Sequence, residues 1–294
     1  GKAMELNASL FGREKRSDGR FPHQLRPPAV EVGLLHRADG SARFRLGDTS
    51  VTVAVYGPSE AQQQRKTLLD RAYVEVLVRP LSGPADAEER SREAILQKIF
   101  EAAIDTPRHP RTVVQITVQP MNNDKPMMHV CVVGIYMALL DASVPLRSLP
   151  LAVALAYRPL PQGSPDTDFP FLVDPLHTEL AACEGCIVIV LDASHRRSKA
   201  ERDEGDEALP SSAAAAAAAV RRASDAPRGR VLATFPECGG AMPPEVFHTA
   251  LKVAENACKV LDSFVRLSFE RRLTLLQAAF RVQNSHGGDD DDDD

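Results

Sequence analysis

The sequence predicts a mixed fold, either α+β or two-layer α/β, that ends in one long helix. Three observations support this. Short β-type runs dominate the first eighty residues, two helical patterns then interrupt the strands, and an amphipathic pattern closes the chain. The expected order is four strands, helix, strand, helix and three strands. That order lacks the regular alternation of a doubly wound nucleotide-binding sheet, so we do not expect that fold.

The four N-terminal strands are separated by turn signals. ADGS at 38–41 and GDTS at 47–50 contain glycines that allow the positive φ of tight hairpins. Pro80 ends the last of the four, because proline cannot donate to a strand ladder. The predicted strands are 30–36, 42–46, 51–57 and 73–80.

Two helices are predicted in the middle of the chain. Residues 91–104 have apolar residues at helical spacing and acids ahead of the first turn, after a loop at 81–89. A β-branched strand follows at 112–119. The second helix begins after Pro126 and is apolar on all sides, which predicts a central position in the core.

The C-terminal part resumes the strands and ends in the long helix. The predicted strands are 151–159, 171–174, 186–192 and 231–236. From Glu245 onward, apolar residues recur at three- and four-residue steps, which is typical of an amphipathic helix. These residues are Val246, Ala250, Val253, Ala257, Val260, Leu261 and Phe264.

Composition divides the chain into one domain with three appended or inserted segments. We expect an N-terminal arm at 1–29, a single domain made of 30–194 and 230–285, a low-complexity insertion at 195–229, and an acidic tail at 286–294. The insertion holds a run of seven alanines, which is too short to sustain an isolated helix.

Charge and cysteine content narrow the possible functions. The formal net charge is −5, and without the six aspartates at 289–294 the rest of the chain carries +1. A nearly neutral body predicts that any RNA contact comes from a small local patch. Five cysteines, an odd number, and no signal-like or membrane-spanning run predict reduced thiols in the cytosol or nucleus.

Several stretches together resemble the RNase PH-like proteins, and among them the ring subunits of the eukaryotic RNA exosome. The resemblance rests on 25–58, which contains RADGSA, GDT and YGP, on 91–104 followed by HPRT at 109–112, and on 137–149. It implies an RNase PH-like, ribosomal protein S5 domain 2-like two-layer fold, and six such subunits in a ring with RNA threaded through its pore.

The resemblance also implies where the chemistry should lie. Active members hold phosphate with a Gly-Ser/Thr-Arg element at the start of the central helix and use two nearby aspartates. Carried over by position, the element falls on Pro126, Met127 and Met128, and the aspartates fall on Leu180 and Cys186. Proline lacks a backbone donor, and a thioether cannot replace a guanidinium group. We therefore expect no catalytic residue, no metal and no cofactor.

The same reasoning predicts that this helix start holds no anion and packs against protein. The Met127–Met128 pair fits either an adaptable interface or ordinary core filling. His109 and His129 have no partner at ligand spacing, so we interpret them as structural histidines whose hydrogen bonds are satisfied. Cys183 and Cys186 have redox or zinc spacing but no second pair, which favours incidental thiols.

Two further groups are candidates for function. Glu179 and Glu184 flank the lost aspartates and could support hydrolysis, although no anion cradle would position the nucleophile. Arg90 and Arg92, in the loop before the first helix, and Lys125 are the predicted RNA-binding residues, with a solvated helix start as the alternative. RSDGR at 16–20 resembles the family's arm motif and is expected at a ring contact or the channel mouth.

We therefore expect a non-catalytic exosome ring subunit without an appended RNA-binding domain. Its expected partners are other RNase PH-like subunits in a hetero-hexameric ring, cap subunits, a separate catalytic ribonuclease and RNA in the channel, without a membrane. The expected location is nucleus, nucleolus and cytoplasm. The alternatives are an active nuclease working as a homodimer or through the glutamates, and a free RNA-binding module that is a monomer.

Overall fold

The computed structural model describes most of the chain. The described residues are 16, 18–60, 68–84, 86–122, 126–158, 170–194, 230–239 and 244–286. The predicted insertion at 195–229, the acidic tail from 287 and Lys125 lie outside them. No helix among these residues is both long and apolar enough to cross a membrane.

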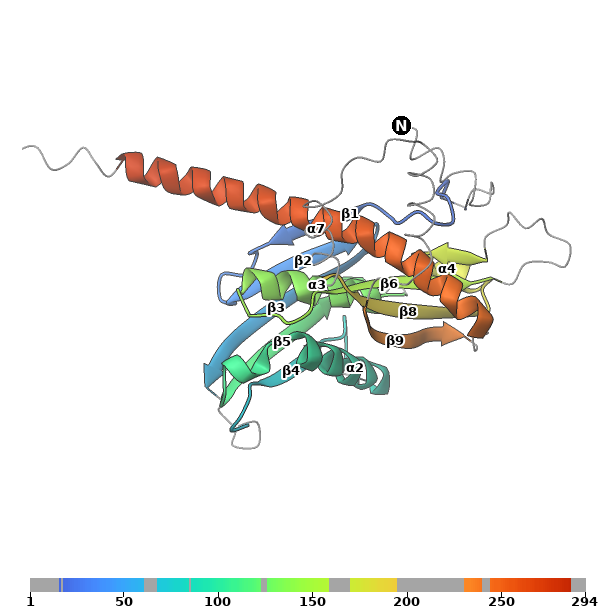
Figure 1. The fold of residues 1–294 in the computed structure, drawn as a ribbon, viewed down its shortest axis with the longest axis horizontal. Coiled ribbons are helices and arrows are strands. Elements are labelled where there is room, and N and C mark those ends of the chain that lie inside the picture. Colours follow the sequence, from blue (N-terminus) through green and yellow to red (C-terminus); the bar gives the residue numbers. More distant parts are fainter. Residues whose placement is uncertain are drawn as a thin grey trace, which may run out of the picture.

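Nine strands and five helices are described in chain order (Figure 1). The strands are β1 (Pro28–Val32), β2 (Gly40–Leu46), β3 (Thr49–Glu60), β4 (Tyr73–Val78), β5 (Thr112–Pro120), β6 (Pro150–Tyr157), β7 (Phe171–Val173), β8 (Gly185–Asp192) and β9 (Arg230–Gly239). The helices are α2 (Ala87–Ala103), the 3-10 turn η2 (Thr106–Arg108), α3 (Met128–Asp141), the single-turn α4 (His177–Leu180) and α7 (Pro244–His286).

The strands form two sheets. The first has the order β1-β2-β3-β5-β4 and is antiparallel except for β4 and β5, which are parallel and joined through α2. The second is antiparallel with the order β7-β6-β8-β9. These elements confirm the predicted α+β class. The predicted first strand extends too far, because β1 ends at Val32.

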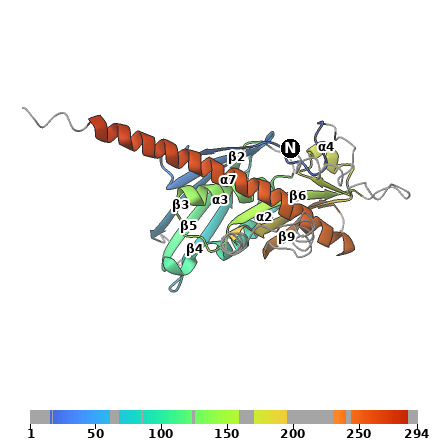
Figure 2. The same ribbon diagram turned by 45° about the horizontal axis from the view of Figure 1, so that its top comes forward.

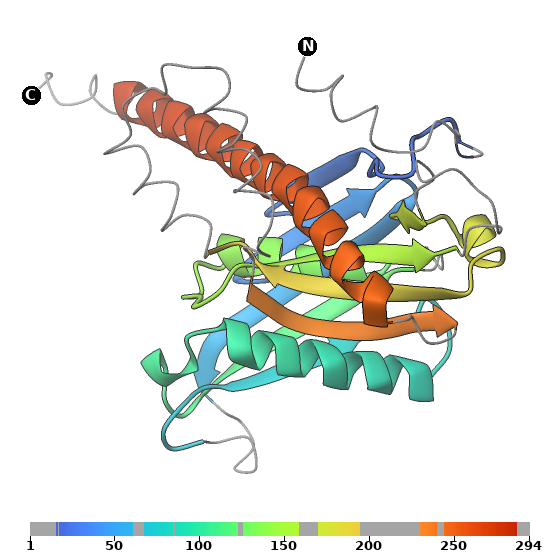
Figure 3. The same ribbon diagram turned by 45° about the vertical axis from the view of Figure 1, so that its right-hand side comes forward.

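Helix α3 forms the centre of the core. It packs on β2 and β3 of the first sheet and on β6 and β8 of the second, so it lies between the two sheets (Figure 3). Every side chain from Met128 to Leu139 is buried, which confirms the central position predicted from its all-round apolar sequence. Gly40 allows β2 to approach the end of α3, since a Cβ atom there would lie 2.3 Å from the backbone nitrogen of Ala142.

Helix α7 crosses the second sheet and continues beyond it (Figures 1 and 2). Its buried face includes Ala250, Ala254 and Leu261, whereas Val260 and Leu267 are exposed. Burial on one face and exposure on the other confirm the amphipathic pattern, except that Val260 belongs to the predicted apolar pattern and is exposed.

Helix α2 begins earlier than its apolar pattern predicts. It starts at Ala87 after the N-cap Asp86, whose backbone N–H donates to Glu89 Oε2 over 2.9 Å. The Glu89 carboxylate thus accepts a hydrogen bond from a backbone N–H group at the helix start. This capping allows the helix to begin before the first residue of its apolar pattern. The prediction that Arg90 lies in the loop entering the helix is therefore wrong, and Arg92 lies on the helix, within the predicted range 91–104.

Truncating a side chain of α3 should destabilise the whole domain. For Leu139→Ala we expect the free energy of unfolding to fall by about 2–5 kcal/mol, because Leu139 is fully buried between the two sheets and leaves a cavity. Denaturant titration measures this loss. Leu267→Ala on the exposed face of α7 is the matched control, and an equal loss there would contradict a core centred on α3.

Candidate functional site at the start of helix α3

The first turn of α3 is buried by apolar groups. Pro126 is buried, and Met127 and Met128 are each 3% exposed within the core. Of the two interpretations of the methionine pair, core filling is confirmed.

This helix start nevertheless holds a negative charge. Glu237 on β9 places its Oε1 atom 2.7 Å from the backbone nitrogen of Met127 and 3.2 Å from that of Met128, and both N–H groups donate to it. Its Oε2 atom is buried and has no hydrogen-bond partner among the described residues. The prediction that the helix start holds no anion is wrong in this respect. The free N–H groups and the partial positive charge of a helix start favour a carboxylate in that place.

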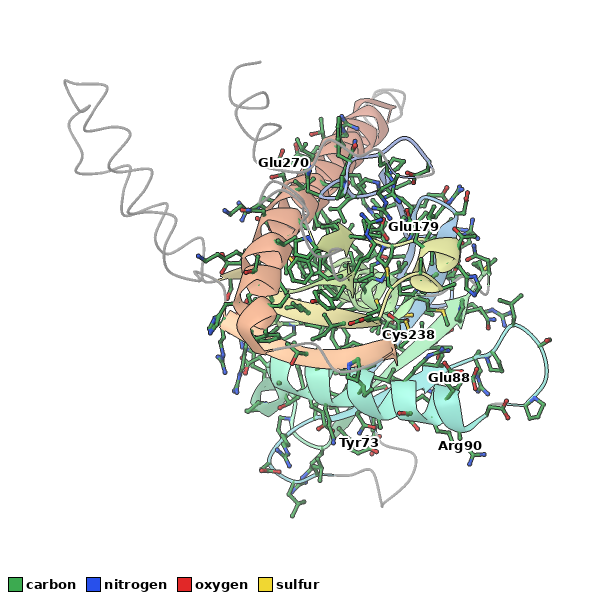
Figure 4. All side chains as sticks on the ribbon, turned by 90° about the vertical axis from the view of Figure 1, so that its right-hand side faces the viewer. Tyr73, Glu88, Arg90, Glu179, Cys238 and Glu270 are labelled. Atoms are coloured by element: carbon green, nitrogen blue, oxygen red, sulfur yellow. The ribbon has the colours of Figure 1, made fainter. Side chains whose placement is uncertain are left out.

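The position of the second lost aspartate holds a buried thiol. Cys186 is 3% exposed on β8, directly opposite Cys238 on β9, whose position Figure 4 labels. Burial first, and then the charge of Glu237, raise the pKa of Cys186 far above the usual thiol value. The same two causes raise the pKa of Cys131 on α3 to about 12. Both thiols therefore stay protonated at neutral pH and cannot replace a carboxylate.

The first lost aspartate position, Leu180, ends the short helix α4, and Glu179 beside it is held by an arginine. Arg16 Nε donates to Glu179 Oε1 over 2.8 Å, and Arg16 NH2 binds Oε2. Burial favours the neutral acid, but the bonds from Arg16 and from the backbone N–H of Leu176 outweigh it and lower the pKa of Glu179. Glu184 is exposed and has no such partner among the described residues. The two glutamates therefore have different environments and do not form a matched pair.

A buried cluster of charged residues, formed by Asp174, Arg26 and His129, lies next to this helix start. Asp174 is fully buried and has φ 50°, and its carboxylate accepts hydrogen bonds from Arg26 Nε at 2.7 Å and Arg26 NH2 at 2.6 Å. His129 Nε2, in the first turn of α3, lies 3.3 Å from Asp174 Oδ1. Burial alone would raise the pKa of Asp174, but hydrogen bonds from His129 and Arg26 and their charges hold it well below its usual value.

The two predicted structural histidines differ. His129 is 1% exposed beside Asp174, which confirms a structural position, yet neither of its ring nitrogens meets hydrogen-bond geometry with a described residue, although Nε2 lies 3.3 Å from Asp174 Oδ1. The expectation that all of its hydrogen bonds are satisfied is therefore wrong. His109 follows η2 and is half-buried, and its carbonyl accepts a hydrogen bond from Thr112 Oγ1.

The predicted RNA-binding residues do not share one environment. Arg90 is exposed on the first turns of α2 and projects from the edge of the helix opposite to Glu88 (Figure 4). Arg92 is 8% exposed, and its NH2 group lies 2.6 Å from Glu88 Oε1. Lys125 lies outside the described residues. Of the three, Arg90 has the exposure that a phosphate contact needs, and the RNA-binding assignment stays a prediction.

The arm motif at 16–20 folds back on the body of the protein. Arg16 is buried, and besides Glu179 it binds the carbonyl oxygens of Val173 and Asp174 at 2.7 and 3.0 Å. Arg20 NH1 lies 3.6 Å from Asp174 Oδ2. The first arginine of the motif is therefore committed to holding the arm in place, and the expected ring contact stays a prediction.

The residues that sequence reasoning missed are Glu237, Arg26 and the role of Arg16. Glu237 is one acidic residue in an otherwise unremarked strand, 110 positions from the backbone group it binds. Arg26 lies in a proline-containing arm. Neither has a local pattern, so only the pairing of distant segments identifies them.

Comparison with known proteins agrees with this fold. Residues 24–145 match the family described as RNase_PH, 3' exoribonuclease family, domain 1. Among solved structures, that of rice Rrp46 superposes with a TM-score of 0.68 at 22% identity, covering 87% of this chain and 100% of that chain. An Archaeoglobus fulgidus exosome with RNA bound to the active site gives 0.61 at 18% identity, covering 89% and 94%. The chain is RNase PH-like in fold.

Curated relatives place the similarity within exosome components. The chain is 33% identical to the Arabidopsis thaliana protein named exosome complex exonuclease RRP46 homolog, over 47% of this chain and 57% of that protein. It is 34% identical to exosome complex component rrp46 of Schizosaccharomyces pombe, over 47% and 61%. It is also 34% identical to exosome complex component Rrp41 of Methanopyrus kandleri, over 47% and 62%. The matched segment spans about 60% of the length of these relatives.

The buried Asp174 makes stability depend on acid pH. Its folded-state pKa is lowered, so its contribution is present above the unfolded value of about 3.9 and is lost as pH falls below that value. For Asp174→Asn we expect a loss of about 3–5 kcal/mol at pH 7, because Arg26 is left buried without its partner, and a shallower loss of stability below pH 4. Urea titrations from pH 7 to pH 2 test this. The exposed Asp70→Asn is the control, and parallel pH profiles for Asp174→Asn and the parent would contradict it.

Removing the carboxylate at the helix start should destabilise α3. For Glu237→Ala we expect the free energy of unfolding to fall by about 1 kcal/mol, since two backbone donors lose their acceptor. The pKa of Cys131 should also fall, because Glu237 raises it. Chemical unfolding and the pH profile of thiol labelling measure the two effects. Glu184→Ala removes an exposed carboxylate and should change neither.

Proposed function

We propose that the chain is a catalytically inert ring subunit of an RNA exosome. It forms part of the channel for 3'-to-5' RNA processing and degradation, including rRNA processing. The observation that carries this proposal is the start of α3, where two backbone N–H donors of the helix already bind Glu237 and where Met128 stands in place of a guanidinium group.

The chemistry of phosphorolysis explains why this observation matters. The reaction needs an anion cradle that positions phosphate as the nucleophile and a carboxylate that assists the leaving oxygen. A fixed carboxylate in the cradle repels phosphate by charge and fills its donors. At the second position, Cys186 stays a neutral thiol. Both requirements are therefore unmet at the positions that the resemblance assigns.

The proposed role is architectural. The subunit would pack against other RNase PH-like subunits in a hetero-hexameric ring, under cap subunits and together with a separate catalytic ribonuclease. Arg90 would face RNA in the channel. An exosome component of this kind would work in the nucleus, including the nucleolus, and in the cytoplasm. The names of the relatives support this role.

One observation favours a second candidate, an active nuclease. The Arabidopsis and rice relatives are both named exosome complex exonuclease RRP46 homolog. One acid near the site is Glu179, whose carboxylate is bound by Arg16 and would have to be released before it could activate water.

An activity assay separates the two candidates. We expect the purified chain to leave 3'-tailed RNA intact with either inorganic phosphate or magnesium, and the complex recovered from cells to have the size of a multisubunit ring. RNA degradation that Glu179→Gln abolishes and Glu184→Gln preserves would overturn the inert assignment. A monomer with salt-sensitive RNA affinity would instead indicate a free RNA-binding module.

A further inference from the structure

The segment that follows α2 and the loop around residues 145–147 are hydrogen-bonded to each other and to the C-terminal end of α2. Ile104 and Leu146 form an isolated β-bridge, the backbone N–H of Asp105 donates to Pro145 O over 2.9 Å, and that of Arg147 donates to Ala103 O over 2.8 Å. These bonds fix Asp105 and Arg147 relative to the helix. Their side chains therefore project from a rigid part of the backbone.

One carboxylate there holds two arginines. Asp105 Oδ1 lies 2.7 Å from Arg147 Nε, and Asp105 Oδ2 lies 3.2 Å from Arg108 Nε. Arg147 Nε donates a hydrogen bond to Asp105, whereas Arg108 Nε forms an ion pair with it. Their terminal NH1 and NH2 groups form no hydrogen bond to a described residue, and the two side chains are 57% and 69% exposed. We refer to Arg108, Asp105 and Arg147 as the arginine clamp.

Two more exposed arginines lie on the same surface. The backbone N–H of Ala72 donates to Thr106 O, and that of Arg111 donates to Leu68 O, which brings the start of β4 beside η2. Arg71 and Arg111 are exposed there, and Arg111 has the left-handed φ of 62°. A non-glycine residue at positive φ costs free energy, so surrounding contacts hold Arg111 in that conformation. The exposed acids Glu60, opposite Thr112 at the end of β3, and Glu101, in the last turn of α2, lie near these arginines, so the arginine clamp is distinguished by the positions of its guanidinium groups and not by net charge.

The arginine clamp is separate from the predicted contact at Arg90. Arg90 is in the first turns of α2 (Figure 4), whereas the clamp lies past its last turn, beside η2 and the first residues of β4 and β5 (Figure 1). A helix of 17 residues is about 25 Å long. The two proposed RNA contacts therefore lie at opposite ends of the helix.

We propose that the arginine clamp binds the phosphodiester backbone of single-stranded RNA. Guanidinium groups recognise phosphate through paired N–H donors, and a carboxylate that holds their Nε atoms leaves the terminal donors pointed outward. Such contacts fix the path of the strand without reading its sequence. This proposal rests on the proposed role in an RNA channel and adds a second contact for the strand, one helix length from Arg90.

Binding of the full-length chain to a fluorescein-labelled oligo(A) strand tests the arginine clamp. For the double variant Arg108→Ala/Arg147→Ala we expect about tenfold weaker binding, and a salt slope of log Kd reduced by about 1.4, because two phosphate contacts are lost. The control is Arg43→Ala/Arg266→Ala, which removes the same charge from partly exposed arginines on β2 and α7. Binding equal to that of the parent, or an equal loss in the control, would overturn the proposal.

Asp105→Ala distinguishes a positioned clamp from a general positive charge. It makes the surface more positive, so charge alone predicts tighter RNA binding, whereas loss of the positioning carboxylate predicts weaker binding. Tighter binding would contradict the arginine clamp.

Co-purification of each variant with RNase PH-like subunits tests the proposed ring role independently. Variants that assemble but bind RNA weakly support the clamp. Variants that fail to assemble indicate that the surface binds protein, which contradicts the clamp. A parent chain that never assembles rejects the ring role itself.

Discussion

The structure depends on the burial of the first turn of α3. A helix that is apolar on every side has to be covered on every side, and here two sheets cover it. Burial removes water from the first backbone N–H groups of the helix. These groups therefore need a hydrogen-bond acceptor from the protein. Glu237 is that acceptor for two of them. Burial first, and then the charge of the half-buried Glu237, raise the pKa of the neighbouring thiols, so packing and helix capping both act against acid chemistry at this position.

A second charged group fixes the surroundings of that turn. Asp174 connects Arg26 in the N-terminal arm with His129 on α3, and the neighbouring Arg16 binds the carbonyl oxygen of Asp174 and the carboxylate of Glu179. Buried ions are tolerated when hydrogen bonds satisfy them, and breaking one partnership is costly. The arm, β7 and α4 are therefore held to the core by charge pairs. The carboxylates of Asp174 and Glu179, which could otherwise act in catalysis, are bound by arginines that stabilise the fold.

Much of this architecture was predictable from the sequence because periodicity is local. The all-apolar run after Pro126 predicted a central helix, and the three- and four-residue steps after Glu245 predicted α7. The start of α2 was missed because capping by Asp86 and Glu89 overrides the apolar pattern. The substitutions at 126–128 were identified by resemblance, whereas Glu237 was not, since nothing near it in sequence indicates which donors it meets. Side-chain partners of that kind follow from strand pairing between distant segments.

The position of Glu237 on β9 has a consequence for biosynthesis. The donors at Met127 and Met128 leave the ribosome more than a hundred residues before the acceptor that they need. Within its sheet β9 pairs only with β8, at an edge, so it can join after the other strands are in place. The central helix thus remains uncapped in a nascent chain until β9 has been synthesised, and any product that stops before β9 also lacks the core residues of α7.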